Sequence, residues 1–164
     1  MCFHNDHEDV WSGDCRVRLI AFDGRTLYEH IQTVTIGPRG SHRFDIPDGF
    51  DARSDALIVA ELKNERALHF FHRDKHTPYP KPDFTAKTEQ SNGTTILAIT
   101  AKSLLRDLMI FPERLDPDAM IDDQMVTLLP GDTHRFVIKS RLDLAPEALT
   151  WKPVMQLAND YSGG

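Results

Sequence analysis

Residues 15–24 read Cys-Arg-Val-Arg-Leu-Ile-Ala-Phe-Asp-Gly, and this stretch indicates the fold class of the chain. Apolar side chains recur at every second position from Cys15 to Ala21, and the two arginines between them would lie on the opposite face, as in a half-buried strand. The Asp-Gly pair that follows is a strong hairpin signal, because a type I′ turn needs positive φ at both central residues. We therefore predict a strand that turns back on itself after Phe22.

The same period of two recurs along most of the chain, between residues that favour turns. The run from Leu27 to Ile36 breaks strict alternation between Ile31 and Val34, so we expect a β-bulge there. The other expected strands lie at residues 42–46, 56–63, 67–72, 84–89, 94–100, 124–129 and 134–140. Many short strands without a long amphipathic helix are typical of antiparallel β-sandwiches.

Residues 101–111 fit two interpretations. Leu104, Leu105 and Leu108 have the spacing of a helical face, whereas the neighbouring strands favour one more strand. We favour the strand. Residues 146–164 form a tail without a clear period.

A proline-rich segment divides the chain. Residues 77–82 read Thr-Pro-Tyr-Pro-Lys-Pro, and prolines at this density exclude a helix and favour an extended spacer. Because the strands divide about equally on either side, we predict two small sandwiches in tandem, at residues 1–77 and 78–164. Each would be small, so we expect the junction to add burial, with Tyr79 packed there.

Composition excludes several classes of protein. The 164 residues carry 19 basic and 25 acidic side chains, so the net charge is −6 and a nucleic-acid partner is not expected. No apolar run approaches the ~20 residues of a membrane helix. A (β/α)₈ barrel needs at least ~200 residues and is excluded. The polar N-terminus does not read as a signal peptide, which predicts a cytoplasmic protein, or an extracellular one if an upstream leader has been removed.

Metal-ligand residue types gather in two places, but neither predicts a metal site. Residues 4–9 read His-Asn-Asp-His-Glu-Asp, in which His4 and His7 could share an ion with an acid; we interpret the segment as a solvated loop. In the second group, His69 and His72 would point to opposite faces of a strand, with His76 beyond a turn. No structural metal is therefore expected.

The sequence offers no catalytic constellation. Retaining glycoside hydrolysis needs two carboxyl groups roughly 5 Å apart across a cleft. The candidate pairs are Asp122 with Asp123 and Asp116 with Asp118, and acids so spaced in a loop more often form turns. A nucleophile elbow, a phosphate-binding loop and a dinucleotide fingerprint are all missing from the sequence. We therefore assign no catalytic, cofactor-binding or metal-binding residue.

Two stretches resemble a known family. Residues 123–132 read Asp-Gln-Met-Val-Thr-Leu-Leu-Pro-Gly-Asp and precede a predicted strand. They are similar to the "DNFFDLLPGE" strand–turn–strand near the C-terminus of family 2 glycoside hydrolases of the β-mannosidase type. Gln124 stands where the family has Asn, and Met125 and Val126 replace its aromatic residues.

The second stretch, residues 70–83, resembles the family's joint between its last two sandwiches, "F-x-x-P-K-x-x-x-L-P-x-P". Lys75 and the Pro-Lys-Pro sequence match, while the proline before the lysine is missing. The chain also opens like the penultimate sandwich of that family, with Asn5-Asp6, Gly13 and then Phe-Asp-Gly at residues 22–24.

This resemblance implies two immunoglobulin-like sandwiches that follow the catalytic barrel of a parent β-mannosidase-like enzyme. It places both catalytic glutamates upstream, since none of the Glu residues here matches them, so the chain alone would not hydrolyse a glycoside. The implied partner is the absent barrel, with carbohydrate as a further candidate. Trp11, Tyr79 and Trp151 are candidate contact residues, because aromatic side chains dominate interfaces and stack on sugars. The alternative is a stand-alone carbohydrate-binding or protein-interaction module.

Overall fold

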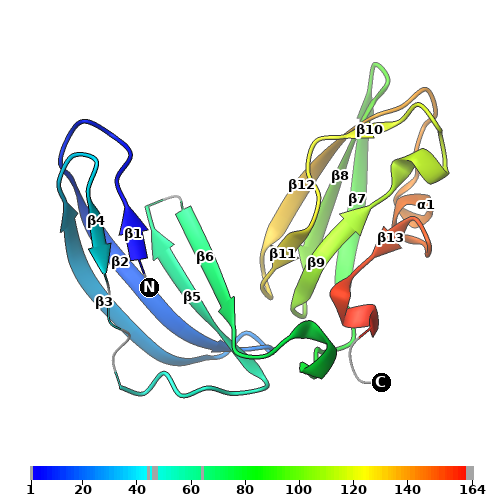
Figure 1. Ribbon diagram of the computed structural model, residues 1–164. Helices are drawn as coiled ribbons and strands as arrows, with labels where there is room; N and C mark the ends of the chain where they lie inside the picture. Colours follow the sequence, from blue (N-terminus) through cyan, green and yellow to red (C-terminus); the bar gives the residue numbers. More distant parts are fainter. Residues whose placement is uncertain (1, 44, 46–47, 64, 162–164) are drawn as a thin grey trace. The chain divides into compact units, whose positions relative to one another are not determined.

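The computed structural model describes residues 2–43, 45, 48–63 and 65–161. The chain divides into two compact units, one formed by Met1–Ala21 and Arg25–Arg73 and the other by Phe22–Gly24 and Asp74–Gly164. Both units consist mainly of antiparallel strands (Figure 1), which confirms the predicted all-β sandwich class. Among the described residues, no helix is long and apolar enough to cross a membrane.

The first unit is built on one four-stranded sheet. Its strands are β1 (Cys2–His4), β2 (Trp11–Ala21), β3 (Thr26–Ile36), β4 (Ser41–Arg43), β5 (Ala56–Leu62) and β6 (Glu65–Phe70). The order β3-β2-β5-β6 makes the large sheet, and β1 pairs with β4 in a small one. The predicted strand at residues 42–46 lies partly outside the described residues.

The core of the first unit follows the predicted alternation. Cys15, Val17 and Leu19 of β2 are all buried, and the arginines between them lie on the other face. The core cluster consists of Cys15, Val17, Leu19, Val34, Ile36, Phe50, Ala56, Ile58 and Ala60. Phe3, Phe50 and Phe71, which lie outside the large sheet, contribute to the packing.

The first hairpin forms as predicted, but its turn is of another type. Only Gly24 in this turn has positive φ, at 91°, and the Ala21 amide donates to the Arg25 carbonyl at 2.9 Å. A type I′ turn would need positive φ at Asp23 as well, so that prediction is wrong. The Asn92–Gly93 turn does have both values positive, 48° and 73°, because two strands meet there without an extra residue.

The predicted bulge between Ile31 and Val34 does not form. β3 pairs with β2 in unbroken register from Ile36 to Tyr28, and the irregularity lies beyond it, between Leu19 and Ile20. Val34 is buried, whereas Ile31 lies on the opposite face and is 52% exposed. The sequence broke alternation because an apolar residue occupies an outward position.

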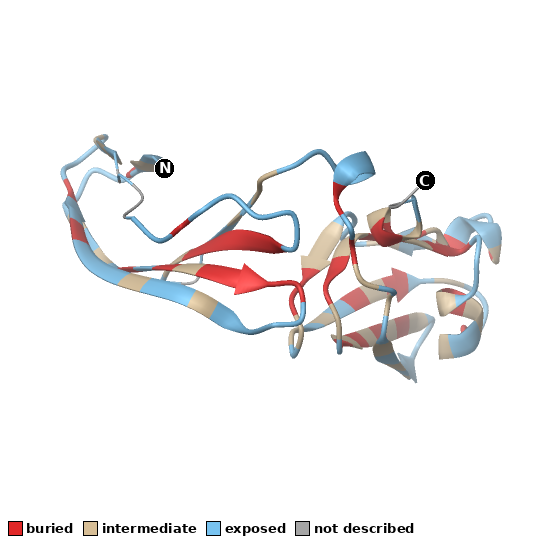
Figure 2. Cartoon of the chain, turned by 90° about the horizontal axis from the view of Figure 1, so that it is seen from below, coloured by how far each residue is buried: buried red, intermediate tan, exposed pale blue. Residues whose placement is uncertain are grey.

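The second unit consists of two sheets around one core. Its elements are η1 (Asp74–His76), β7 (Phe84–Ser91), β8 (Thr94–Ala101), β9 (Leu105–Ile110), η2 (Pro112–Arg114), β10 (Met120–Ile121), β11 (Val126–Leu128), β12 (Thr133–Lys139), α1 (Pro146–Thr150), β13 (Met155–Gln156) and η3 (Ala158–Tyr161). The sheet orders are β10-β12-β8-β7 and β11-β9-β13. Residues 105–110 are a strand, as the favoured interpretation of residues 101–111 predicted. Figure 2 shows buried residues in this unit next to partly exposed ones, and along β8 the two kinds alternate.

The tail has more structure than its sequence suggested. Leu149 of α1, Met155 of β13 and Leu157 are buried in the core of the second unit. These elements are too short to show a period, since β13 has only two residues. β13 pairs with β9 and α1 packs against β7, and local sequence does not reveal either contact.

Candidate functional site

Asn5 lies in the N-terminal stretch that resembles the β-mannosidase-type family. Its side chain joins two loops of the first unit. Its side-chain amide donates to the carbonyl oxygens of Asp9 at 2.8 Å, Gly37 at 3.0 Å and Ile36 at 3.3 Å. Its carbonyl oxygen accepts from the His7 amide at 3.1 Å. Asn5 is only 4% exposed, and these hydrogen bonds satisfy both polar atoms of its buried side chain. This residue therefore holds the two loops in place.

Residues 123–132, which resemble the same family, also have a structural role, because their side chains bind backbone groups. The Gln124 side chain pairs with both backbone groups of Ile110, accepting from its amide and donating to its carbonyl, as a strand neighbour would. The Asp132 carboxylate accepts from the Leu129 amide at 3.0 Å across the turn, where Gly131 has φ of 92°. An acid and a glycine are needed there to close the turn.

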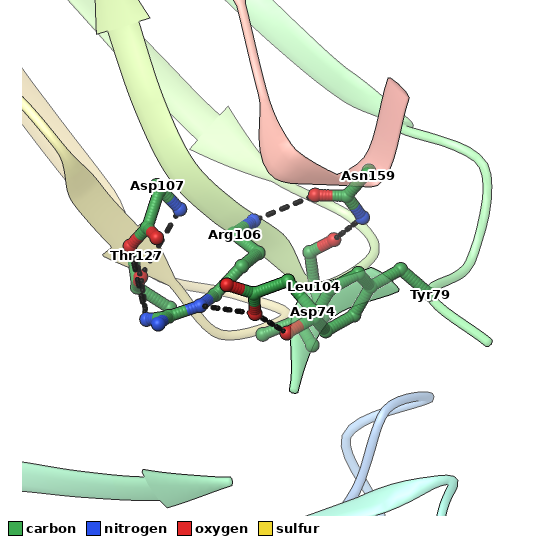
Figure 3. A network of polar contacts seen from close by, with 7 residues as sticks. All are labelled: Asp74, Tyr79, Leu104, Arg106, Asp107, Thr127 and Asn159. Atoms are coloured by element: carbon green, nitrogen blue, oxygen red, sulfur yellow. Dashed lines mark hydrogen bonds and ion pairs between the residues drawn. The ribbon is translucent and has the colours of Figure 1, made fainter. Parts of the chain in front are cut away.

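A polar network surrounds Tyr79 in the second unit (Figure 3). The buried Tyr79 hydroxyl donates to Asp74, and the Arg106 guanidinium lies 3.5 Å from the same carboxylate oxygen. Burial, together with Asp74, raises the pKa of the Tyr79 hydroxyl well above its ordinary value. Arg106 also donates to Thr127 at 3.1 Å and pairs with Asp107 at 2.9 Å. The tyrosine is thus held as a neutral donor.

Asn159 extends this network to the tail. Its amide donates to the carbonyls of Leu104 at 2.8 Å and Pro80 at 3.0 Å, and its oxygen accepts from the Arg106 amide at 2.7 Å. The residue is 7% exposed. The network fastens the proline-rich segment, β9 and the tail to one another (Figure 3), and the segment at residues 77–82 contains neither helix nor strand, as predicted. Sequence analysis missed Asn159 because its partners are distant in sequence.

The acidic pairs occupy turns. Asp116 accepts from the Arg141 amide and the Ser140 hydroxyl, both at 2.8 Å, and these bonds hold its pKa below the ordinary value. Asp122 and Asp123 each accept a backbone hydrogen bond. These contacts fit the interpretation of the acids as turn formers. That the chain has no catalytic residue stays a prediction.

The histidine groups do not converge within the described residues. No cluster of three or more His, Cys, Asp or Glu side chains with metal-binding geometry occurs there. His69 packs edge-on against Phe71, with the ring centres 5.6 Å apart. The prediction that the chain has no structural metal is untested.

Two hollows of the first unit combine aromatic and polar side chains, and one of them is lined by Phe50, Phe71 and His69 among others. The other contains a tryptophan. This hollow has a volume of about 530 Å³, and its lining includes Asn5 and, among the other polar and aromatic residues, His4, Asp6, His7, Trp11, Lys63 and Glu65. We call it the Trp11 hollow. Ligand pockets typically have volumes of roughly 300–1,000 Å³. Of the three aromatic candidates, Trp11 lines this hollow, Tyr79 is buried in the polar network, and Trp151 is 74% exposed.

Comparison with known proteins gives a likeness of fold. No protein-family model matches the sequence, and no curated protein matches it significantly. A crystal structure of a β-D-mannosidase from Dictyoglomus thermophilum matches 95% of this chain with a TM-score of 0.67 and 15% identity. The exo-chitosanase of Amycolatopsis orientalis matches 96% with a TM-score of 0.53 and 15% identity.

The match covers only a small part of each solved chain. This chain spans 19% of the β-D-mannosidase and 24% of the exo-chitosanase. The resemblance to a β-sandwich region of a β-mannosidase-type hydrolase, inferred from the sequence, is therefore confirmed at the level of fold.

Proposed function

We propose that this chain is a non-catalytic accessory region of a larger, β-mannosidase-like glycoside hydrolase. In that enzyme it packs against the catalytic barrel. The finer assignments belong to the same proposal: immunoglobulin-like sandwiches, domains at residues 1–77 and 78–164, and a parent enzyme that cleaves terminal β-mannosyl or related bonds.

The main support for the proposal is that the match covers almost all of this chain but only a small part of the solved enzyme. Nearly the whole of this chain matches about a fifth of a β-D-mannosidase, so its fold corresponds to one part of such an enzyme. Two further findings support it. Asn5 and Gln124, both in family-like stretches, have structural roles in loops and strands. The acidic pairs are engaged in turns.

The non-catalytic part of the proposal is tested with the purified chain. Aryl β-mannoside, β-glucosaminide and β-galactoside should release no aryl alcohol above the rate of a mock preparation. The matched control is the Asp116→Asn protein, prepared identically, which should give the same background. Turnover that increases with protein concentration and falls in an acidic-residue variant would contradict the proposal.

A further inference from the structure

We propose that the Trp11 hollow binds a neutral glycan, one or two pyranose units long. The inference rests on the proposed function for its choice of a sugar as the ligand, and on the geometry of the first unit for the site itself. Three properties of the hollow support it: a fixed aromatic ring, walls that are held in place, and a balanced set of polar groups.

The indole of Trp11 has a fixed position. It lies at the start of β2 and packs against the core of the first unit. A methyl group added at Gly13 would come within 2.9 Å of the Trp11 ring, so glycine allows the ring to lie against the strand. The Lys63 ammonium is 4.9 Å from the ring centre.

Lys63 covers the face of the Trp11 ring on which a sugar would stack. A cation is attracted to the negative face of an indole, and the polarised C–H groups of a pyranose are attracted to the same face more weakly. Such a cation–π contact at an exposed site is a weak interaction. Lys63 is exposed and lies at the turn between β5 and β6, so its flexible side chain can move aside and donate to a sugar hydroxyl.

The loop that contributes Asp6 and His7 to the hollow is held in place. Asn5 anchors this loop to Ile36, the last residue of β3, and to Gly37, which follows it. An ion pair between Glu8 and Arg39, at 2.7 Å, joins the same two loops. In Figure 1, β1 and this loop lie at the same end of the unit as the turn between β5 and β6. Little ordering is therefore needed when a ligand enters.

The polar side chains favour a neutral ligand. Asp6 and Glu65 can accept hydrogen bonds, while His4, His7 and Lys63 can donate them. Within the described part of the chain, the side chains of Asp6, His7 and Glu65 have no hydrogen bond or ion pair to another residue. The acids would repel an anion, whereas sugar hydroxyls both donate and accept and so can use both kinds of group.

Another hollow of the first unit differs from the Trp11 hollow because it has no aromatic residue. It lies on the outer face of the sheet, where Asp14, Arg16 and Arg66 contribute to its lining. It shares Lys63 and Glu65 with the Trp11 hollow, but its lining contains no aromatic residue. Arg16 already pairs with Glu29 at 3.0 Å. This surface lacks the stacking element that a sugar needs.

The test uses the two tryptophans of the chain. Trp151 belongs to the second unit and is 74% exposed, so a Trp151→Phe protein retains Trp11 as its only indole. Its fluorescence is titrated with β-1,4-mannobiose and with cellobiose, and sorbitol serves as the non-cyclic control. We expect a saturable change with at least one disaccharide and none with sorbitol. No saturable change with either disaccharide, or an equal change with sorbitol, would overturn the inference.

Charge-neutral variants in the Trp151→Phe background test the polar groups. Asp6→Asn combined with Glu65→Gln should weaken binding about tenfold or more, because hydrogen bonds to charged groups are lost. Asp9→Asn is the matched control: it lies in the same loop, outside the hollow, and should bind within about twofold of the parent. Equal affinities for all three proteins would contradict the site.

Failure of this inference and failure of the proposed function are distinguishable. If the chain occurs within a larger glycosidase but no sugar alters Trp11 fluorescence, the accessory role stands and the sugar site is wrong. If disaccharides bind and the chain occurs without a catalytic partner, the sugar site stands and the accessory role is wrong.

Discussion

The two units differ in how they close their cores. The second unit packs two sheets against each other and adds α1 and the tail, and its core cluster contains fourteen buried apolar residues among those described. The core cluster of the first unit lies on one face of its large sheet and contains nine such residues among those described. Ile20, Leu57 and Val59 are buried on the opposite face. Because stabilisation rises with apolar area removed from water, the second unit should be the more stable. The Trp11 hollow lies in the first unit.

The largest expected effect is in the core of the second unit. Phe136 lies in β12 and is fully buried. Phe136→Ala should lower the free energy of unfolding by about 3–5 kcal/mol, from lost burial and the cavity left behind. Hydrogen exchange followed by mass spectrometry should show faster exchange in β8 and β12 than in β2 and β5. Uniform acceleration across all four strands would remove the distinction between the units.

A smaller loss is expected from the matched change in the first unit. Ile58 lies in β5 and is 2% exposed. Ile58→Ala should cost about 2–3 kcal/mol, at the low end for such substitutions, because a core covered by loops can relax around the cavity. Exchange should now increase in β2 and β5. A loss as large as that of Phe136→Ala would show that the first core is as tightly closed as the second.

The two buried asparagines extend the comparison to polar contacts. Asn159→Ala leaves two backbone carbonyls and one amide of the second unit without their partner, and should cost about 1–3 kcal/mol. Asn5→Ala should cost about 1 kcal/mol, because water can reach the more exposed loops around it. Chemical denaturation of both variants measures the difference. A larger cost for Asn5→Ala would contradict this ranking.

The smallest expected effect is a dependence on acid. Asp116 has a pKa below its ordinary value of 3.8, so its contribution to stability is complete above that value and is lost as the pH falls through the lower, folded-state pKa. Thermal unfolding of the second unit should therefore become easier in this acidic range. Asp116→Asn should flatten the dependence, and an unchanged pH profile in this variant would show that other carboxyl groups cause it.

Alternation in the sequence predicted the strands but not their connections. The strand at Cys15 to Ala21 could be assigned because Cys15, Val17 and Leu19 alternate with the more exposed arginines. The turn at Gly24 could not be typed, since an extra residue in the loop replaces the second positive φ that a type I′ turn needs. The bulge predicted at Ile31 does not form, because hydrophobic residues are not confined to the interior and this one lies on the exposed face.

Only some of the residues that line the Trp11 hollow could be identified as candidates from the sequence. Residues 4–9 were candidates because they include metal-ligand types, and Trp11 was a candidate contact residue. The sequence pattern did not indicate that they lie near Lys63 and Glu65. These residues meet because β2 and β5 are neighbours and because Asn5 fixes the loop. Asn159 and the tail were missed for the same reason, since their partners are contributed by distant segments.

The size and activity of the natural polypeptide test the accessory role most directly. Antibodies raised against this 18.7 kDa chain should precipitate from source cells a polypeptide several times larger. Peptide mass spectrometry should identify this sequence in it, and the precipitate should hydrolyse an aryl β-mannoside or a related β-glycoside. A precipitate that contains only an 18.7 kDa species, without glycosidase activity or a catalytic partner, would contradict the account.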